Sequence, residues 1–488
     1  MEYIDDQPYR MLIDGRWQTG GEGTLFPTYD PATGEVLAQV HAATVHDVDA
    51  AVRAARRAYE AHWRDTTPRE RARLLRRLAT LFEREVEKLA WIETRNVGKP
   101  ITHSRESLSA MPASLEYFAG IIPAVRGDTI PLLNSASVLN FTLREPLGVC
   151  ALVMPWNYPM TLTLHKLAPA LAAGNTVVIK PSEVTPLSTL ALAALFAEAG
   201  FPEGVVNVVN GPGATVGETL VRHPGVARVS FTGGTATGAA IQAAAAADVK
   251  RVTLELGGKS PLIVFDDAAV DAAVGVAAAD IVKNSGQVCI ACTRLLVQDT
   301  LRDAFQEKLE ARLAAIRVGD PANPETQMGP LVSRAQADRV RRYLDIAHSE
   351  GATPRACVDL SSRPETARGF YVAPTLLVTA DNGMQTSQEE IFGPVQSLIG
   401  FKDEDEALRI ANDTRYGLAA IVFTRDGGRA LRMARRLESG SVAINTGVRT
   451  SVDAPFGGYK HSGIGKERGL EAILENTQLK NVKYDTSL

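Results

Sequence analysis

The sequence of 488 residues predicts an α/β protein built around a doubly wound parallel sheet. Between residues 149 and 231, short β-branched runs alternate with helical stretches, which is the pattern of a parallel βαβ sheet. A second run of the same kind spans residues 262–423. Because a chain of this length can bury a large core, we expect two or three domains.

Composition excludes several classes of protein. Hydrophobic residues make up 45% of the chain and charged residues 22%, as in an ordinary globular enzyme. The net charge of −4 is far from the basic excess of a nucleic-acid-binding surface. The N-terminal residues include Glu2, Asp5 and Asp6 and lack an apolar segment, so we expect no signal peptide. No uncharged apolar run is long enough to span a membrane. We therefore expect a cytoplasmic protein that binds neither nucleic acid nor membrane.

The first half of the chain begins with a small antiparallel sheet, predicted over residues 9–40 from short apolar runs separated by turn dipeptides. Amphipathic helices are predicted around residues 48–59 and over residues 70–96, where apolar side chains recur at helical spacing. The strands predicted for the first βαβ unit are 149–153, 176–179, 205–209 and 226–231. The helices predicted between them are 162–173, 187–199 and 214–223.

Residues 138–144 have a different pattern. Leu139, Phe141 and Leu143 alternate with polar residues, which predicts a half-buried strand on a projecting arm. Its apolar face needs cover, and an exposed strand edge invites pairing. Residues 478–484 are a second, weaker strand candidate.

One cysteine lies in a position suited to catalysis. Cys289 is expected on a loop between a buried helix, 268–282, and a short strand, 294–297, and catalytic residues often lie on such loops. A lone cysteine is nevertheless more often an inert small hydrophobe. Cys292 completes a C-x-x-C, but no second ligand pair accompanies it, so we expect neither a redox pair nor a metal site. From the residues alone, the role of Cys289 stays open.

Three segments are candidates for binding a nucleotide. Gly211–Gly217 follows a strand and opens a helix, but it is one residue longer than G-x-G-x-x-G and is equally well explained as a tight turn. Lys180 and Glu183 follow a strand and could hydrogen-bond a ribose diol, or Glu183 could merely favour a helix dipole. In Phe231–Gly238, small residues at a helix start could present backbone amides to a pyrophosphate.

Several long motifs resemble those of the aldehyde dehydrogenase superfamily. Asn-Ser-Gly-Gln-Val-Cys at 284–289 and Leu-Glu-Leu-Gly-Gly-Lys-Ser-Pro at 254–261 are similar to its paired active-site signatures. The likeness extends from residues 13–17 to residues 455–460. The resemblance implies an NAD-binding domain, an α/β catalytic domain and a β-arm for oligomerisation into a homodimer or homotetramer. Their expected ranges are, respectively, 1–122 with 147–255, 256–447, and 123–146 with 448–488.

The resemblance also implies the chemistry: the oxidation of a small-molecule aldehyde to a carboxylic acid. The Cys289 thiolate would attack the carbonyl carbon, and Asn157 would donate a hydrogen bond to the resulting oxyanion beside the Cys289 N–H. Glu255 would activate the water that hydrolyses the thioester. Lys166 and Glu467 match a pair associated with proton release in some members.

The implied cofactor is NAD. A carboxylate at Glu183, beside the 2′-hydroxyl, would repel a 2′-phosphate, so we expect NAD to be preferred over NADP. Gly234 stands where many members have serine. The expected cofactor-binding residues are Pro155, Trp156, Lys180, Ser182, Glu183, Gly213, Phe231, Thr232, Gly233, Gly234, Leu256, Glu390 and Phe392.

The expected substrate tunnel departs from the family pattern at two positions. His165 replaces a frequent tryptophan and Lys283 a frequent aromatic residue, and Arg449 could add a third cation. We therefore expect a semialdehyde or another polar-tailed substrate rather than a cationic one. The alternative is that Lys283 extends to the tunnel mouth and His165 fills space. The expected substrate residues are Tyr158, His165, Lys283, Ile290, Arg449 and Phe456.

Two other functions remain open. In a CoA-acylating member, a thiol rather than water would resolve the thioester, which would leave the base Glu255 without a task. A catalytically silent structural homologue would be expected to lack the nucleophile or the base. This chain has Cys289, Glu255, Asn157 and Glu390 together.

Overall fold

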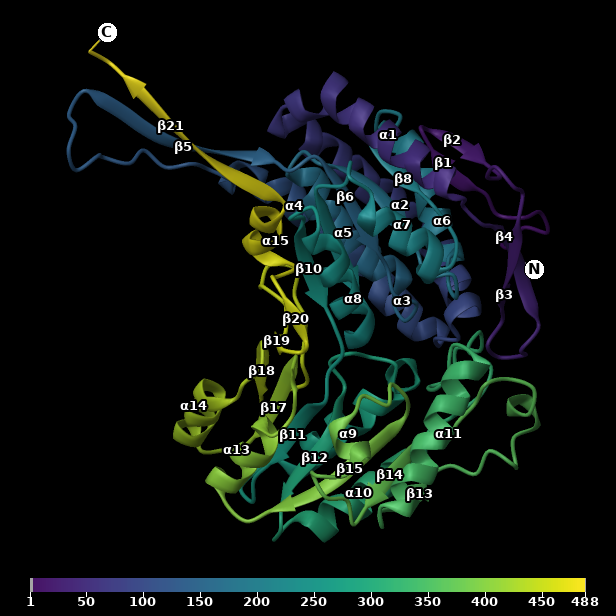
Figure 1. Ribbon diagram of the computed structural model, residues 1–488. Coiled ribbons are helices and arrows are strands. Elements are labelled where there is room, and N and C mark those ends of the chain that lie inside the picture. Colours follow the sequence, from purple (N-terminus) through teal and green to yellow (C-terminus); the bar gives the residue numbers. More distant parts are fainter. Residues whose placement is uncertain (1–2, 488) are drawn as a thin grey trace.

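The computed structural model describes residues 3–487, and two large sheets form its frame (Figure 1). The first sheet has eight strands, of which the five central ones are parallel and the outer β1 and β20 pair antiparallel to their neighbours. Across the sheet the order is β2 (Arg16–Gln18), β1 (Met11–Ile13), β8 (Val206–Val208), β7 (Thr176–Lys180), β6 (Val149–Val153), β9 (Arg228–Thr232), β10 (Arg251–Glu255) and β20 (Gly463–Ile464).

Helices cover both faces of the first sheet, as the doubly wound prediction requires. Along β6, Cys150 and Leu152 face one hydrophobic core while Val149 and Ala151 face another, because side chains alternate along a strand. The helices against the first core are α2 (Pro68–Val97), α3 (Ile101–Ser109), α4 (Met111–Ile121), α5 (Pro159–Ala172) and α6 (Leu187–Ala199). Those against the second are α1 (Val45–Ala61), α7 (Glu218–Arg222) and α8 (Thr235–Ala246).

The second sheet has seven strands, which are parallel except for β13 at one edge. In order across the sheet these are β13 (Thr353–Ala356), β14 (Thr375–Val378), β15 (Val395–Phe401), β12 (Cys292–Gln298), β11 (Ser260–Val264), β17 (Ala419–Phe423) and β18 (Ser441–Ile444). One face packs against α9 (Val270–Val282) and α10 (Arg302–Ala314), and the other against α11 (Arg334–Ser349), α13 (Glu404–Asn412) and α14 (Gly427–Arg436).

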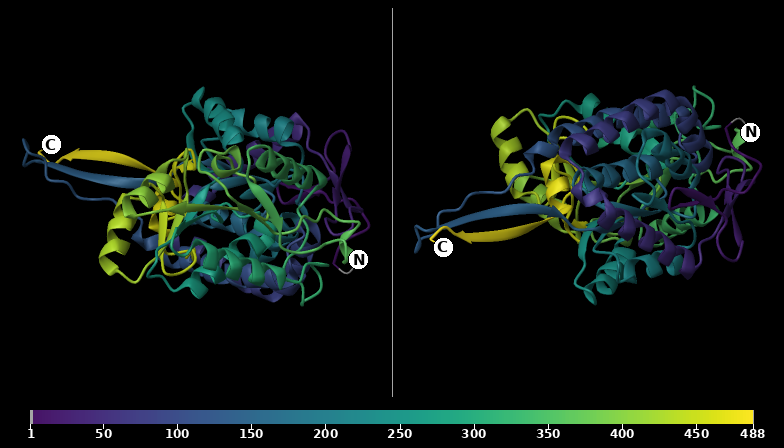
Figure 2. Two further views of the ribbon diagram at one scale, coloured as in Figure 1. Left: turned by 90° about the horizontal axis from the view of Figure 1, so that it is seen from below. Right: turned by 90° about the horizontal axis from the view of Figure 1, so that it is seen from above.

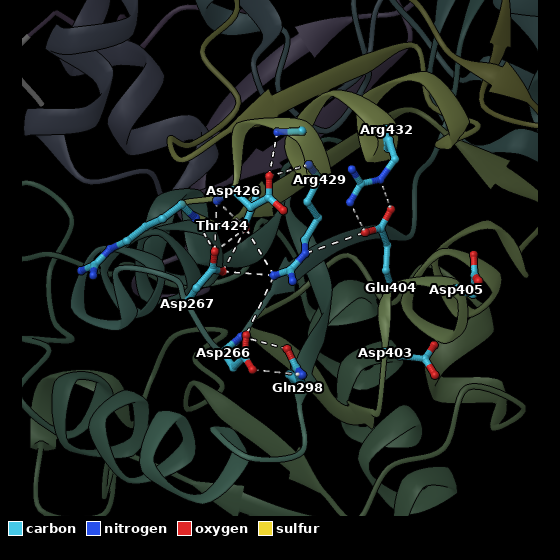
Figure 3. Close-up of polar contacts among 12 residues, drawn as sticks. Asp266, Asp267, Gln298, Asp403, Glu404, Asp405, Thr424, Asp426, Arg429 and Arg432 are labelled. Carbon is cyan, nitrogen blue, oxygen red and sulfur yellow. Dashed lines mark hydrogen bonds and ion pairs between the residues drawn. The ribbon is translucent and has the colours of Figure 1, made fainter.

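A polar network fixes α13 and α14 to the end of this sheet (Figure 3). Asp267, just beyond β11, accepts hydrogen bonds from the Thr424 hydroxyl at 2.9 Å and from the backbone N–H groups of Arg425 and Asp426 at 3.0 Å. Arg429 of α14 pairs with Asp267 at 3.2 Å and also lies 3.8 Å from Glu404 of α13. This network connects the segment after β11 to α13 and α14, which come much later in the chain.

The predicted arm projects away from the two sheets (Figures 1 and 2). Strands β5 (Val138–Pro146) and β21 (Thr477–Asp485) pair antiparallel, with Phe141 opposite Val482. The polar side chains Asn140 and Thr142 are buried on one face, whereas Leu139 on the other is exposed. The strand prediction is confirmed, and the cover that its apolar face needs is not provided by the residues described here.

The C-terminal segment does more than complete the arm. Residues after 448 supply β20 to the edge of the first sheet, and α15 (Gly469–Glu475) then leads into β21. Smaller pairs are β3 (Leu25–Tyr29) with β4 (Val36–His41), and β16 (Tyr416–Gly417) with β19 (Tyr459–Lys460). The short helix α12 (Gln385–Gln388) precedes β15. Within residues 3–487, no helix combines the length and the hydropathy needed to cross a bilayer.

Candidate active site

Cys289 lies on the loop between the helical turn Lys283–Gly286 and β12, as predicted. The turn contains successive left-handed residues, with φ of 47° at Asn284, 55° at Ser285 and 73° at Gly286. A Cβ at Gly286 would lie 2.3 Å from the carbonyl oxygen of Gly393, so only glycine fits there. Such strained backbone persists only where its surroundings hold it in place.

Buried amides supply that support. Asn284 Nδ2 donates to the Asn157 carbonyl at 3.0 Å, and Gln287 Nε2 donates to the Asn284 carbonyl at 2.9 Å. The Gln287 Oε1 accepts the backbone N–H of Val332 at 2.9 Å, and Ser285 Oγ donates to the Gly329 carbonyl at 2.7 Å. The polar residues that precede the cysteine in its motif therefore fix the shape of the loop, a role that sequence reasoning missed.

Asn157 lies beside this loop, where an oxyanion donor is expected. Its side chain is buried, and its Nδ2 donates to the Gln287 carbonyl, two residues before Cys289, at 3.0 Å. An amide nitrogen carries two hydrogens. Among the described residues one of them has this partner, and the other is available to a ligand oxygen at the cysteine.

Glu255 ends β10 and is only 4% exposed. Among the described residues, neither of its carboxylate oxygens has a hydrogen-bond partner. Gly457 makes room for it, because a Cβ there would lie 2.8 Å from Glu255 Oε1. Burial first, and the nearby charge of Glu467 second, hold the pKa of Glu255 well above its usual range. A buried carboxyl without partners is an unusual arrangement and a feature typical of catalytic acids and bases.

A buried ion pair lies next to this carboxyl. Lys166 of α5 and Glu467 are in direct contact through Nζ and Oε1, and both are almost completely buried. The Ser230 hydroxyl donates to the same Glu467 oxygen at 3.4 Å. Because both charges act on Glu255, the three residues form one electrostatic unit, with Glu467 opposing its ionisation and Lys166 favouring it.

The thiol of Cys289 is protonated in this arrangement. Burial, followed by the charges of Glu390 and Glu255, raises its pKa to about 12, and the Arg468 guanidinium acts in the opposite direction. Since the thiolate is the nucleophile, a base must remove this proton before the sulfur attacks. Cys292 is completely buried in β12, and both cysteines are free thiols. Within residues 3–487, no group of three or more His, Cys, Asp or Glu residues is arranged to hold a metal ion.

The predicted ribose-binding residues come together at the end of β7. Lys180 Nζ donates to Glu183 Oε2 at 2.9 Å, and the Gly213 N–H donates to Glu183 Oε1 at 3.3 Å. Burial opposes ionisation of Glu183, but the charge and hydrogen bond of Lys180 outweigh it and lower its pKa. A Cβ at Gly213 would meet nothing within 4 Å, so the space beside this carboxylate is open. Ser182 lies on the same turn and is nearly buried.

The second glycine segment lies at the start of α8. A Cβ at Gly233 would lie 2.4 Å from the Phe231 ring, whereas one at Gly234 would meet nothing within 4 Å. Thr232 Oγ1 is buried without a partner among the described residues. Leu256 lies close to α8, because a Cβ at Gly238 would come within 2.5 Å of its side chain. The open N-terminus of α8 and the unpartnered hydroxyl fit a phosphate-bearing ligand.

Glu390 and Phe392 connect the two sheets. Glu390 Oε1 accepts the Gly258 N–H at 3.1 Å, and burial raises the pKa of this carboxyl to about 7. A Cβ at Gly258 would lie 2.6 Å from the Cys289 carbonyl oxygen, which brings this segment against the nucleophile loop. Phe392 meets Trp156 edge to face at 5.1 Å between ring centroids, and Trp156 follows Pro155 after β6.

The predicted substrate residues fall into two groups. Lys283 is half-exposed, with Nζ 3.8 Å from Glu106 of α3, and Tyr158 has its ring 4.2 Å from Lys99 Nζ. Phe456 and Arg449, by contrast, line a cavity of about 220 Å³. Ile290, directly after the nucleophile, is half-buried.

His165 is the third basic residue predicted for the tunnel, and it is uncharged. Burial, followed by the charges of Arg468 and Lys166, holds the pKa of His165 well below its usual range. Its Nδ1 lies 3.3 Å from Arg468 Nη2. Sequence reasoning did not identify Arg468, which is nearly buried and lines the same cavity as Phe456. Its position directly after Glu467 was the one available signal.

A doubly wound α/β sheet faces a second domain that presents a cysteine near a buried carboxyl, an arrangement that fits an oxidoreductase. The sequence matches the aldehyde dehydrogenase family over residues 17–482. The chain therefore belongs to this family and is an aldehyde dehydrogenase.

Solved structures agree with the assignment. A putative aldehyde dehydrogenase from Burkholderia cenocepacia is 43% identical, with 98% of each chain covered and a TM-score of 0.96. PnpE from Pseudomonas sp. WBC-3 is 43% identical over 99% of this chain and 98% of its own, with a TM-score of 0.95. Betaine aldehyde dehydrogenase from Staphylococcus aureus, solved with NAD+, is 38% identical over 100% and 97% respectively, with a TM-score of 0.97.

Proposed function

We propose that this aldehyde dehydrogenase uses NAD to oxidise a small-molecule aldehyde to its carboxylic acid, through a Cys289 thioester that water hydrolyses. The observation that carries the proposal is Glu255, a buried carboxyl that has no hydrogen-bond partner among the described residues and interacts electrostatically with Cys289. Burial holds its pKa well above its usual range, which makes the ionised carboxylate a stronger base.

The residues divide the work by step. Once deprotonated, Cys289 forms a C–S bond to the carbonyl carbon, and the Asn157 amide and the Cys289 N–H stabilise the oxyanion. When bound, NAD accepts the hydride that leaves this carbon. Glu255 then takes a proton from water as the oxygen attacks the thioester, and the C–S bond breaks to release the acid. Glu467 and Lys166 are positioned to pass that proton onwards.

The cofactor residues fit NAD. The Glu183 carboxylate, held by Lys180, suits a ribose diol, and the open start of α8 at Gly234 suits a pyrophosphate. Ionised Glu183 repels a 2′-phosphate, so we propose a preference for NAD over NADP. The ratio of kcat/KM for the two cofactors tests this. Glu183→Gln should move the ratio towards NADP, and an unchanged ratio would contradict the assignment.

The Glu255 carboxyl also favours hydrolysis of the thioester over acyl transfer to CoA. Acyl transfer to a thiol does not require a base that activates water. The buried Glu255 carboxyl would therefore have no role in it. The decisive experiment follows NADH absorbance across a panel of aldehydes, with and without CoA. NADH should form without CoA and carboxylic acid should accumulate. Formation of NADH that depends on CoA would contradict hydrolysis, and no NADH with any aldehyde would indicate a catalytically silent homologue.

We further propose a semialdehyde or another polar-tailed aldehyde as substrate, and a homodimer or homotetramer as the functional assembly. The polar residues around the cavity support the first proposal, and the exposed apolar face of the arm supports the second.

A further inference from the structure

The cavity lined by Phe456 and Arg449 also holds the guanidinium of Arg468. Arg468 is 8% exposed, and no carboxylate among the described residues forms an ion pair with it. Its nearest polar contact is the uncharged His165, at 3.3 Å. The nearby charge of Glu467 favours the ionised guanidinium, and a buried guanidinium with no direct ion pair among the described residues can still bind an anionic group of a ligand.

The local backbone holds Arg468 towards the cavity. Its φ is 64°, and the adjacent Gly469 N–H donates to the Val452 carbonyl at 2.8 Å. Glu467 exchanges short backbone hydrogen bonds with Phe456, at 2.6 and 2.7 Å. The Arg468 guanidinium then lies 5.1 Å from the centre of the Phe456 ring. Stacking on an aromatic ring orients a guanidinium while leaving edge N–H groups free to bind a carboxylate.

The Arg468 charge also lies close to the residues that are proposed to carry out the reaction. The guanidinium of Arg468, which lines the cavity, interacts electrostatically with Cys289 and Glu255, so it lies near both of them. Exposed Arg449 lines the same cavity, next to Thr450 and Ser451, and provides a second guanidinium. The nearest acid on that loop, Asp453, accepts the Ser451 hydroxyl in a short hydrogen bond.

We propose that Arg468, assisted by Arg449, binds a carboxylate at the tail of the aldehyde, so that the preferred substrates are short aldehydes bearing a terminal carboxylate. The inference rests on the proposed function, because Cys289 must hold the aldehyde end. It assigns the tail to Arg468 rather than to Lys283, which already faces Glu106. A bidentate, charge-assisted contact between the guanidinium and the carboxylate would favour these substrates over uncharged aldehydes.

The test compares two four-carbon aldehydes, succinic semialdehyde and butanal, with NAD. Wild type should show the higher kcat/KM for succinic semialdehyde. Arg468→Met should lower the ratio of the two kcat/KM values about ten- to a hundredfold, the range for removal of a hydrogen bond to a charged group, mainly through KM for succinic semialdehyde. Arg449→Met should lower it less, because Arg449 is exposed, and Arg468→Lys should recover part of it.

A second readout separates substrate binding from an effect on the thiol. The pH dependence of Cys289 alkylation by iodoacetamide reports any change in thiolate formation, which affects both aldehydes equally. An equal loss for both aldehydes would overturn the inference, as would loss of the preference in Lys283→Met instead. Arg435→Met, on the exposed surface of α14, is the matched control and should change nothing.

The failure of this inference is distinguishable from failure of the proposed function. If wild type oxidises butanal but does not prefer succinic semialdehyde, the carboxylate site is overturned and the aldehyde dehydrogenase activity stands. If Arg468→Met does not fold, as shown by its circular dichroism melting curve, Arg449→Met and Arg468→Lys decide the question. An unchanged ratio in both of these variants overturns the proposal.

Discussion

At the scale of single residues, the site depends on two buried acidic groups, the thiol of Cys289 and the carboxyl of Glu255. Burial favours the protonated form of both Cys289 and Glu255, and the charge of Glu255 raises the pKa of Cys289 further. In the proposed mechanism, loss of the Cys289 thiol proton activates the sulfur. Loss of the Glu255 carboxyl proton then allows the carboxylate to activate water. We therefore expect the nucleophile and the base to act in separate steps.

Cys289 should be essential and Cys292 dispensable. Cys289→Ala should abolish NADH production while NAD binding, measured by calorimetry, persists. Cys292→Ala should keep most of the activity and lose about 1–2 kcal/mol of unfolding free energy, because a buried sulfur leaves a small cavity in β12. The opposite pattern of activities would show that the loop has been assigned wrongly.

Glu255 should act after hydride transfer. Glu255→Gln should still release a burst of NADH close to one per site, and then stop, because the thioester has no activated water. Rapid-mixing absorbance measures the burst, and mass spectrometry detects the acyl group on Cys289. Absence of the burst would instead assign Glu255 to removal of the thiol proton.

The raised pKa of Glu255 also predicts how stability changes with pH. In the unfolded chain its pKa is about 4.3, so the unfolded state loses this proton first. Folding is therefore disfavoured increasingly as pH rises from about 4.3 towards the higher folded pKa. Glu255→Gln removes this cost, and its Tm should exceed that of wild type by more at pH 7 than at pH 5. Glu83→Gln, at an exposed position, should shift neither value.

At the scale of elements, the sequence was informative wherever periodicity was strong. Helix α6 and strand β6 were predicted with the bounds that the structure gives them. The predicted helix 214–223 is instead a π-helical turn, Gly213–Gly217, followed by α7, because Pro212 and two glycines alter its first turn. Local patterns carry this information only where neighbouring elements do not override it.

Sequence motifs predicted the individual residues of the candidate site, but not how these residues are arranged in space. Long motifs predicted roles for Cys289, Glu255 and Asn157, and the structure places all three near one loop. Arg468 was missed because its significance comes from the cavity that it faces and from the neutral His165 beside it. Both are tertiary facts, which no local pattern encodes.

The junction of β11, β17 and α14 should depend on Asp267. Asp267→Asn should lower the free energy of unfolding by about 1–3 kcal/mol at neutral pH, because it weakens several charge-assisted hydrogen bonds at once. Asp266→Asn is the matched control and should cost less, since Asp266 lies 3.9 Å from Arg429. Chemical denaturation of the three proteins measures both effects.

The same junction should weaken in acid. Burial opposes ionisation of Asp267, but the hydrogen bonds from Thr424, Asp426 and Arg425 and the charge of Arg429 outweigh it and lower its pKa. Its stabilisation is therefore complete above the unfolded pKa of about 3.9 and is lost as pH falls through the lower folded value. The difference between wild type and Asp267→Asn should shrink over this acidic range. A difference that stays constant would contradict the role of its charge.

At the scale of the whole molecule, the arm predicts assembly. Alternation along the paired strands brings Leu139, Phe141, Leu143, Val482 and Tyr484 to one face. Three of these side chains, those of Leu139, Leu143 and Tyr484, are more than 40% exposed in the single chain. Exposed apolar surface of this kind marks an interaction site.

Replacing Leu139 and Phe141 together with lysine should therefore lower the mass measured by light scattering, because two charges would enter the contact. Asn481→Lys adds a charge to the opposite face of the arm and is the matched control, whose mass should remain that of wild type. If the double variant keeps the wild-type mass, another surface must hold the assembly together.

The edge strand β20 has a consequence for how the protein is made. Strand β10, which ends at Glu255, finds its outer partner only at Gly463, about 200 residues later in the chain. At a synthesis rate of 5–20 residues per second, that interval lasts roughly 10–40 s. During this time the nascent first sheet has an unpaired edge while the whole second domain is translated. The enzyme therefore completes its first domain last, and a chain cut short before residue 463 should bind chaperones rather than fold.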